Sequence, residues 1–223
     1  MPPLSPATSV EDVLRHRMKV ELRKRMRAVR ATLPLGARRA RSARLVDRLA
    51  TLEPLERAQS VALFSPIAAR CEVELSSLDA LLRARGTRIA YPRLIAEDST
   101  SMEFRFVSDI ARMVEHPFGM LEPCAADPLA APGKIDVIVV PALAADPRGH
   151  RIGYGAGHYD RALAIHAPSA ASVAVVFDFQ LVIEVPNSQH DVAVDWIVTD
   201  ARTIRSETRS VGGDIALPVN PMG

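Results

Sequence analysis

The sequence predicts an α/β fold, with a mainly parallel sheet flanked by helices and a basic helical hairpin in front of it. From residue 60 onward, short strand-like runs alternate with helical segments, which is typical of parallel sheets with right-handed crossovers. Two of the runs, IDVIVV and SVAVVF, are apolar at consecutive positions, so both faces of those strands should be covered. At 223 residues, the chain is long enough for one sizeable domain.

The basic hairpin is predicted from two amphipathic patterns. The first helix should cover residues 13–31, because apolar residues recur there every three to four positions: Leu14, Met18, Leu22, Met26 and Val29. Pro34 and Gly36 break this pattern, and a second helix should then cover residues 37–52 until Pro54 stops it.

The predicted strands are short runs rich in Val, Ile and aromatic residues. They cover residues 60–65, 88–92, 102–107, 135–140, 172–177 and 196–198. A helix with the stripe Leu75, Leu78, Leu81 and Leu82 should lie between the first two, with Gly86 as its left-handed C-terminal cap. We expect residues 1–12 and 210–223 to be flexible ends around one domain of residues 13–209.

Composition excludes several classes of protein. No apolar run approaches the roughly 20 residues that span a bilayer, and the first residues lack the pattern of a secretory signal, so we expect a cytoplasmic protein without a membrane partner. Cys71 and Cys124 are far apart and form no C-x-x-C pair, which indicates neither a disulfide framework nor a cysteine-rich zinc site.

The positive charge is concentrated near the N-terminus. Residues 15–48 contain 13 Lys or Arg against Glu21 and Asp47, although the whole chain carries a net charge of only +2. Such a block can face a nucleic acid, an acidic membrane, a polyphosphate or the protein's own acidic body, and charge alone does not choose among them.

The most informative segment is residues 135–165, which read IDVIVVPALAADPRGHRIGYGAGHYDRALAI. Gly153, Gly155 and Gly157 alternate just before a predicted helix, so backbone N–H groups there can approach a phosphate. Arg151 offers a forked cationic donor, and Asp160 offers a carboxylate for Mg²⁺. The spacing matches neither the G-x-x-x-x-G-K-[ST] loop nor the dinucleotide pattern, and a connection whose glycines serve turns is the alternative.

This segment resembles the signature of the 5-formyltetrahydrofolate cyclo-ligase family, in which a strand ending in Pro leads to an Asp, a Gly and an R-[LI]-G-x-G-x-G-x-[YF]-D core. The resemblance extends over roughly residues 17–205, through a Lys-x-x-x-Arg pair, FSPIAARCEVEL, YPR and HDVAVDWIVTD. It implies closure of 5-formyltetrahydrofolate to 5,10-methenyltetrahydrofolate with ATP and Mg²⁺, a fold related to the ribose-5-phosphate isomerase and CoA-transferase group, and a monomer or weak dimer.

The resemblance assigns a set of residues to ATP. Lys19 and Arg23 lie four positions apart and therefore on one helical face, and the family uses the matching pair for the phosphates. The other arginines of residues 15–48 are interpreted as surface charge. The remaining expected ATP contacts are Gly149, Arg151, Ile152, Gly153, Tyr154, Gly155, Ala156 and Gly157. Tyr154 and Ala156 replace basic residues that some members have.

Substrate and metal contacts also follow from the resemblance. Glu72, with Glu74 as its competitor, should accept hydrogen bonds from the pterin, while Asp160 and Asp191 should hold Mg²⁺. Arg151 and Asp160 are the expected catalytic residues. The other expected substrate contacts are Phe118, Tyr154, Gly155, His158 and Tyr159.

Two positions near this site depart from the family pattern. His158 stands where relatives often have an aromatic residue, and Leu75 stands where many have Thr. Two other functions stay open. A basic RNA-binding protein would use residues 15–48, but the chain lacks an accompanying aromatic platform and the glycine segment would go unused. A noncatalytic folate-binding relative is the other alternative, and the retained glycine core, Glu72 and Asp160 argue against it.

Overall fold

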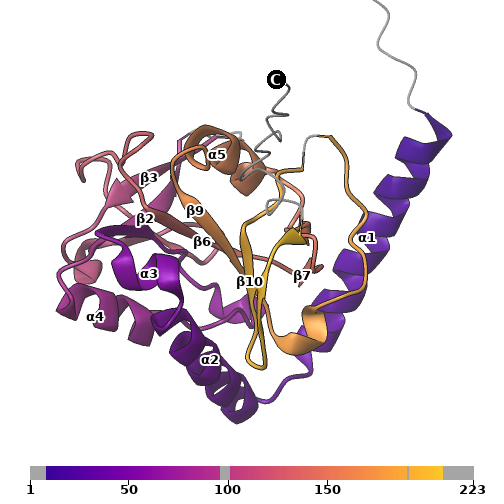
Figure 1. The fold of residues 1–223 in the computed structure, drawn as a ribbon, viewed down its shortest axis with the longest axis horizontal. Coiled ribbons are helices and arrows are strands. Elements are labelled where there is room, and N and C mark those ends of the chain that lie inside the picture. The colour runs from indigo at the N-terminus through magenta and orange to yellow at the C-terminus, as the bar shows by residue number, and fades with distance from the viewer. Residues whose placement is uncertain (1–8, 96–100, 190, 208–223) are drawn as a thin grey trace, which may run out of the picture.

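A seven-stranded sheet forms the centre of the protein (Figure 1). This computed structural model describes residues 9–95, 101–189 and 191–207. The five inner strands are parallel, and the two edge strands, β11 and β3, are antiparallel to their neighbours. The spatial order is β11 (Thr203–Arg205), β10 (Trp196–Val198), β9 (Ala171–Val175), β6 (Val137–Pro141), β1 (Ser60–Ala62), β2 (Arg88–Leu94) and β3 (Met102–Phe106). The predicted mainly parallel α/β sheet is confirmed.

Both faces of the sheet are covered, as the consecutive apolar runs predicted. Val137 and Val139 of β6 belong to one core cluster, whereas Ile138 and Val140 belong to the other, because successive side chains of a strand point to opposite faces. The first cluster includes side chains of α2 (Leu35–Ala50), α3 (Glu53–Arg57) and α4 (Ser76–Ala84), and the second includes those of α5 (His158–His166). Each such fully buried aliphatic side chain stabilises the fold by about 1.5–3 kcal/mol.

The chain order creates a switch point between β1 and β6. β1 pairs with β2 on one side and with β6 on the other, so the connections leaving the two central strands diverge. In open α/β sheets, a crevice forms at the carboxyl ends of the strands where the chain reverses direction in this way, and ligands bind there. The loop after β1 contains Glu72, and the segment after β6 contains the glycine loop.

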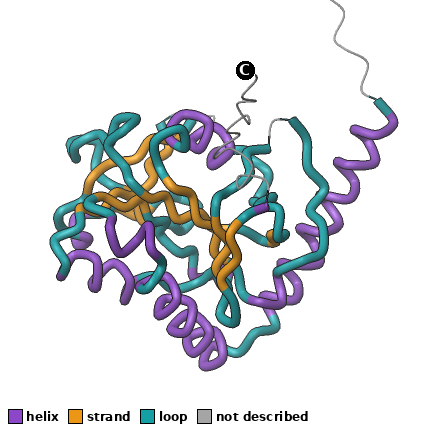
Figure 2. The backbone as a smooth tube through the Cα atoms, in the orientation of Figure 1, coloured by secondary structure: helices purple, strands orange, loops and turns teal. Residues whose placement is uncertain are grey.

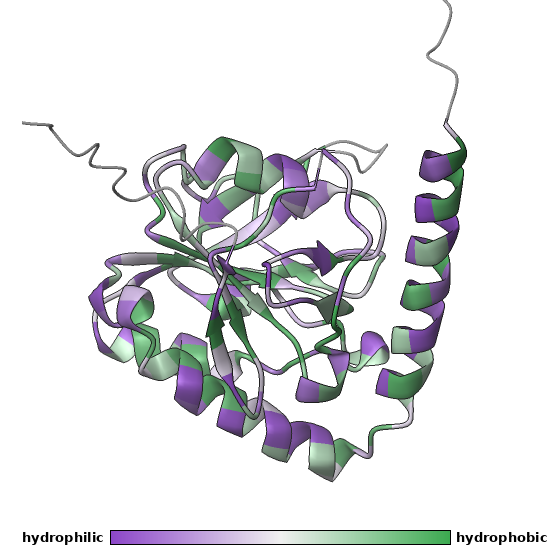
Figure 3. Ribbon diagram, turned by 45° about the vertical axis from the view of Figure 1, so that its right-hand side comes forward, coloured by the Kyte–Doolittle hydropathy of each residue, from purple (hydrophilic) through white to green (hydrophobic). Residues whose placement is uncertain are grey.

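Helix α1 (Val10–Ala31) lies at one side of the molecule, and only part of its length packs against short elements outside the main sheet (Figures 1 and 3). It begins at Val10, three residues earlier than predicted, because Ser9 Oγ accepts the Asp12 N–H at 3.1 Å in a capping box. Its C-terminal half buries Met26 against a small core cluster. In contrast, Leu14 and Met18 of the predicted apolar stripe are 53% and 58% exposed.

Loops and short elements connect the longer helices and strands, and two of the short elements, at residues 68–70 and 144–145, contact α1 (Figure 2). None of these short elements was predicted, because two or three residues are too few to show a periodicity. They are η1 (Ala68–Arg70), η2 (Ile110–Arg112), η3 (Asp178–Gln180) and the hairpins β4 (Val114–Glu115) with β5 (Leu121–Glu122) and β7 (Ala144–Ala145) with β8 (Arg151–Ile152).

The element boundaries otherwise differ from the predictions by a few residues. The helix α3 was not predicted, since Pro54 stands at its start and was taken as a stop, whereas proline is well tolerated in the first turn. Gly86 has a φ of +84° after α4, as expected for a left-handed cap. The expected flexible segment 210–223 lies outside the described residues. Within the described residues, no helix combines the length and the apolar character needed to cross a membrane.

Candidate functional site

The glycine loop, residues 153–157, joins β8 to α5 and leaves its backbone accessible. Gly155 has a φ of +109° and is exposed, and Gly157 has a φ of +69° at the N-cap position of α5. Since Gly157 has no side chain, no side chain caps the first N–H groups of this helix. These groups and the positive end of the helix form a favourable place for an anion.

Helix α1 brings its predicted cations to this loop. The Arg23 Nε donates a hydrogen bond to the Gly153 carbonyl at 3.0 Å, and the Lys19 Nζ donates to Asp191 Oδ2 at 2.5 Å. A Cβ atom at Gly155 would lie 3.6 Å from the Arg23 guanidinium carbon, so the loop and this side chain are in close contact. The structure thus places Lys19 and Arg23 together at the glycine loop.

Arg151 was predicted to donate to phosphate oxygens at the glycine loop, but its side chain is buried and bonded within the protein. Its side chain is only 4% exposed, and its guanidinium donates to the Val192 carbonyl at 2.5 Å and to Asp160 Oδ1 at 3.0 Å. The group therefore ties Asp160 to the segment before β10 instead of projecting into the loop. The sequence shows that Arg151 is charged, but it does not show that the guanidinium is hydrogen-bonded to Asp160 and to the Val192 carbonyl of the same chain.

Asp160 and Asp191 offer the carboxylates that a magnesium ion would need. Asp191 Oδ2 accepts bonds from Lys19 and from the Ser188 N–H, and Asp160 Oδ1 accepts bonds from Arg151 and the Val192 N–H. Burial by itself would raise the pKa of Asp191, but the bonds from Lys19 and Ser188 outweigh it and lower the pKa.

The donor set of this carboxylate pair fits Mg²⁺. Within the described residues, the second oxygen of each carboxylate accepts no hydrogen bond. No group of three or more His, Cys, Asp or Glu side chains able to hold a metal occurs in the same part of the chain. One or two carboxylates are nevertheless what Mg²⁺ uses when phosphates and waters complete its shell. His190, which precedes Asp191, lies outside the described residues.

Glu72 is buried in the loop after β1, at 4% exposure, and accepts the Ile67 N–H at 2.8 Å. Cys71, immediately before it, has a φ of +52°, an uncommon left-handed conformation for a residue with a Cβ atom. Burial, and then the nearby negative charge of Glu72, raise the pKa of Tyr154 to about 12, and the same two causes raise the pKa of Tyr159. Glu72 therefore lies beside both aromatic side chains.

The competing acid, Glu74, points toward the helical layer. Its side chain is 42% exposed and lies 3.9 Å from Arg38 of α2, and its N–H donates to Ser42 Oγ. The geometry thus favours Glu72 as the site residue. Leu75, which stands where many relatives have Thr, lies at the N-cap of α4, and its side chain makes no capping bond.

Phe118 and His158 stand at the edges of the site. Phe118 is 51% exposed on the connection between β4 and β5, which is tied to the segment before Glu72 by a bond from the Leu121 N–H to Ser65 Oγ. His158 is the first residue of α5 and is partly buried. Both positions are compatible with the predicted contacts, while Ala156 is exposed on the glycine loop.

Gly149 and Ile152 serve packing. A Cβ atom at Gly149 would lie 2.1 Å from Ser206 Oγ and 2.5 Å from the Val194 carbonyl oxygen, so only glycine fits there. Ile152 is 2% exposed and packs with Met26 of α1. At these two predicted ATP contacts, packing within the fold explains the residue type. Their contacts fix the chain just before the glycine loop.

Three arginines that were not predicted as site residues surround Tyr154. Arg27 and Arg30 of α1 and Arg70 of η1 line, with Tyr154, Ala31, Ala69 and Cys71, a pocket of about 380 Å³ that we call the arginine pocket. The interpretation of the α1 arginines as surface charge is wrong for Arg30, which is 3% exposed and donates to the Tyr154 hydroxyl. A usable signal was the spacing from Arg23 to Arg27 and Arg30, which continues one helical face.

A glycine loop with uncapped helix N–H groups, two carboxylates and a buried acid thus lie on segments that follow the two strands at the switch point of a parallel sheet, where α/β proteins of this class bind ligands. The chain also matches a family model over residues 15–200. It belongs to the 5-formyltetrahydrofolate cyclo-ligase family.

Individual relatives agree with this family. A 5-formyltetrahydrofolate cyclo-ligase of Mycolicibacterium smegmatis is 45% identical over 93 residues, which are 41% of this chain and 48% of the relative. One of Mycoplasma genitalium is 36% identical over 67 residues, 30% of this chain and 40% of the relative. The chain therefore matches less than half the length of either curated relative.

Solved structures share the fold over most of the chain. The 5,10-methenyltetrahydrofolate synthetase of Aquifex aeolicus has a TM-score of 0.74 and 29% identity, covering 86% of this chain and 93% of that one. The synthetase of Mycoplasma pneumoniae, at 22% identity and a TM-score of 0.66, covers 82% and 98% and supports the fold. The relation to the ribose-5-phosphate isomerase and CoA-transferase group stays a prediction.

Proposed function

We propose that the protein converts 5-formyltetrahydrofolate to 5,10-methenyltetrahydrofolate, using ATP and Mg²⁺ and releasing ADP and phosphate. The observation that carries this proposal is the convergence, at the switch point, of an open glycine loop, the cations of α1 and the buried Glu72, in a chain of the cyclo-ligase family. The protein would act in the cytoplasm as a monomer or weak dimer.

The phosphates of ATP would lie on the glycine loop. The N–H groups at the start of α5, together with Lys19 and Arg23, offset the charge on the phosphoryl group during transfer. Asp160 and Asp191 would hold Mg²⁺, which supplies charge neutralisation at the phosphate oxygens. Arg151 acts indirectly, since its bond orients Asp160.

The pterin would bind between Glu72 and the aromatic side chains. One Glu72 oxygen already accepts the Ile67 N–H, which fixes the carboxylate so that the other can accept bonds from the ring's amino and N–H groups. Tyr159, packed against both core clusters, forms a rigid wall, and Phe118 would close the rim from the opposite loop.

Positioning then suffices for the reaction. The formyl oxygen on N5 attacks the γ-phosphorus of ATP and ADP leaves with the electron pair of the broken bond, giving an activated iminium phosphate. The N10 nitrogen attacks the formyl carbon and gives up its proton, and the phosphate leaves with the electron pair of the C–O bond and takes up that proton, which leaves the methenyl bridge. No covalent bond to the protein is needed, so the residues act by orientation and charge.

The RNA-binding alternative loses much of its basis in the structure. Arg41 and Arg44 of the basic hairpin are paired with Asp200, and Lys19 and Arg23 face the glycine loop. Much of the basic block therefore faces the protein's own body.

A single assay tests the proposed function. Purified protein with 5-formyltetrahydrofolate and Mg-ATP is expected to develop the absorbance of the methenyl product, with one ADP released for each product formed. Absence of both signals, with binding of folate retained, would instead support the noncatalytic relative. Tight, salt-sensitive RNA binding without turnover would support the other alternative.

A further inference from the structure

We propose that Asp146 is a positioning residue, which fixes the segment that carries Asp191 relative to the glycine loop. We call residues 146–150 the anchor turn, and residues 185–189 and 191–194 the Asp191 loop. The inference rests on the proposed function and deepens it, because it makes Asp146 responsible for the relative position of the two carboxylates, Asp160 and Asp191, that would hold Mg²⁺.

The Asp191 loop begins and ends at the anchor turn. The Val185 N–H donates to Asp146 Oδ2 at 2.8 Å, and the Val194 N–H donates to the Gly149 carbonyl at 3.0 Å. The segment between η3 and β10 runs as a loop beside α1 (Figures 1 and 2). In a compact loop whose two ends lie close together, the residues at the base determine where the loop stands.

Asp146 is the buried centre of the anchor turn. Its side chain is 0% exposed, and its Oδ1 accepts the N–H groups of Arg148 and His150 at 3.0 and 3.1 Å. Its Oδ2 accepts the Val185 N–H. Hydrogen bonds from N–H groups to a carboxylate are stronger than those to a neutral acceptor. One carboxylate oxygen therefore shapes the turn, while the other holds the start of the Asp191 loop.

The anchor turn also leads directly to the second carboxylate of the site. Strand β8 follows the turn, and its Arg151 donates to Asp160 and to the Val192 carbonyl. The Val192 N–H in turn donates to Asp160 Oδ1 at 3.2 Å. Asp160 and Asp191 thus lie on two segments that share one base. Loosening that base at Asp146 should shift Asp191 relative to Asp160.

Asp146 itself does not contact a ligand in this arrangement. Its oxygens face three backbone N–H groups inside the protein, and the Arg148 Nη2 lies 3.6 Å from Oδ2 and 2.8 Å from Glu184 Oε1. A carboxylate that is fully buried and bonded in this way is closed to ATP and to the folate. Asp146 therefore acts through Asp191 and is not a catalytic residue.

The test uses Asp146→Asn, which keeps the size of the side chain. The amide oxygen can still accept the N–H groups of Arg148 and His150, but the amide NH₂ then faces the Val185 N–H, so two donors meet and that bond is lost. We expect hydrogen–deuterium exchange in residues 182–189 to become about 10-fold faster, while exchange in β10 stays unchanged. This measurement does not depend on turnover.

Steady-state kinetics supply a second readout. A displaced Asp191 should raise the KM for Mg-ATP about 5- to 10-fold. The KM for 5-formyltetrahydrofolate should stay within about twofold, because Glu72 lies on a different segment. A variant that only lost stability would contain less folded enzyme and would keep both KM values, so the split between the two KM values identifies positioning.

Asp127→Asn is the matched control. Asp127 is 8% exposed and its carboxylate accepts the Cys124 N–H at 2.9 Å, but it lies outside the anchor turn and the glycine loop. This variant should leave exchange in residues 182–189 and both KM values unchanged. Arg148→Gln changes a partly exposed side chain and keeps the bond from Asp146 to Val185, so the KM for Mg-ATP should rise less than about twofold.

The wild-type protein gives a further test that needs no variant, which matters if Asp146→Asn does not fold. In hydrogen exchange followed by NMR, the buried and bonded Val185 amide should exchange about 100-fold more slowly than the amide of the exposed Glu184. Equal exchange rates of the two amides would overturn the anchoring of the Asp191 loop at Asp146.

The outcomes separate the two proposals. Unchanged exchange in residues 182–189 of Asp146→Asn, or unchanged KM values in an active enzyme, would overturn the positioning role and leave the proposed function intact. An effect of Arg148→Gln as large as that of Asp146→Asn would also overturn it. A wild-type protein without turnover would overturn the proposed function, whereas faster exchange in Asp146→Asn but not in Asp127→Asn would still support the anchoring.

Discussion

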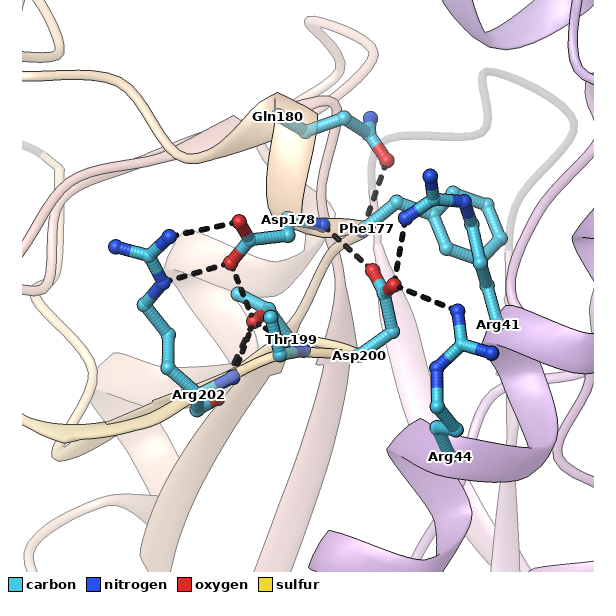
Figure 4. A network of polar contacts seen from close by, with 9 residues as sticks. Arg41, Arg44, Phe177, Asp178, Gln180, Thr199, Asp200 and Arg202 are labelled. Carbon is cyan, nitrogen blue, oxygen red and sulfur yellow. Dashed lines mark hydrogen bonds and ion pairs between the residues drawn. The ribbon is translucent and has the colours of Figure 1, made fainter.

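Two arginine clusters that involve the N-terminal hairpin differ in whether their guanidinium groups form ion pairs with carboxylates. At the first, Arg41 and Arg44 of α2 both donate to Asp200 Oδ2, at 2.6 and 3.2 Å, and Asp200 Oδ1 accepts the Asp178 N–H at 2.8 Å (Figure 4). At the second, the arginine pocket, Arg27, Arg30 and Arg70 meet no carboxylate in ion-pair geometry within the described residues.

We call the first cluster, which consists of Arg41, Arg44, Asp178, Thr199, Asp200 and Arg202, the closed cluster. Both of its carboxylates accept bonds from guanidinium groups. Asp178 accepts bonds from the guanidinium of Arg202 and from the hydroxyl of Thr199, and Asp200 is only 3% exposed. This arrangement links α2 to the ends of β9 and β10. The difference teaches that equal charges need not be equally paired: the guanidiniums of the first cluster have their carboxylate within the chain, whereas Arg30 is buried with an Nε that has no hydrogen-bond partner within the described residues.

The glycine-loop carboxylates lie between these two cases. Asp160 and Asp191 each pair with a cation, yet each keeps one oxygen that accepts no hydrogen bond within the described residues. They are anchored by the fold and remain available for a ligand. Replacing an acid of the first arginine cluster and an acid of the glycine-loop pair therefore separates stability from activity.

The largest effect is expected for Asp160→Asn. The amide keeps the shape of the side chain but removes the negative charge that would hold Mg²⁺ at the phosphates, so kcat should fall about 100- to 1,000-fold. Steady-state turnover at saturating ATP and Mg²⁺ measures this. Asp178→Asn is the matched control and should keep its turnover. Retention of at least half of the wild-type rate by Asp160→Asn would contradict the metal assignment.

Asp200→Asn should lower the stability of the fold and leave turnover nearly unchanged, the reverse of Asp160→Asn. Removing a buried charge that two arginines share should lower the free energy of unfolding by about 2–3 kcal/mol, less than for a fully buried pair because Arg41 and Arg44 are partly exposed. Urea unfolding measures the change. The kcat of the folded variant is expected to stay within twofold, and a large loss of turnover would show that the two clusters are coupled.

Low pH should remove the stabilisation that the Asp200 carboxylate gives to the fold. Burial raises the pKa of Asp200, but the Asp178 N–H and the guanidiniums of Arg44 and Arg41 outweigh it, so its pKa lies below the ordinary 3.8. A lowered folded-state pKa stabilises the fold above pH 3.8, and this stabilisation is lost as the pH falls through the folded value. Unfolding curves of wild type and Asp200→Asn should therefore converge below about pH 4, and a constant gap would contradict this.

The smallest effect is expected for Arg44→Gln. The Arg44 side chain is 53% exposed and its bond to Asp200 is 3.2 Å long, while Arg41 continues to pair with the same oxygen. The loss should be about 0.5 kcal/mol, within the range of exposed ion pairs, and should vanish at high salt. A loss as large as that of Asp200→Asn would mean that Arg44 alone holds the cluster.

Several features were accessible to sequence reasoning because they depend on near neighbours. Consecutive apolar residues identified the covered strands, and a positive φ was correctly expected at Gly86. The four-residue spacing of Lys19 and Arg23 correctly placed them on one face. The ATP and folate roles came from resemblance to a family, and they remain proposals for each residue.

The sequence by itself determined the longer helices and the core strands, since that choice depends on propensity and periodicity within a few residues. It did not predict α3, β11 or the elements of two or three residues. Only the tertiary structure decided the partners of the charges. Lys19 meets Asp191 across 172 residues of chain, Arg151 turns to Asp160, and Arg30 is buried beside Tyr154. The physical reason is that burial and ion pairing depend on how distant segments close on one another, which local pattern does not encode.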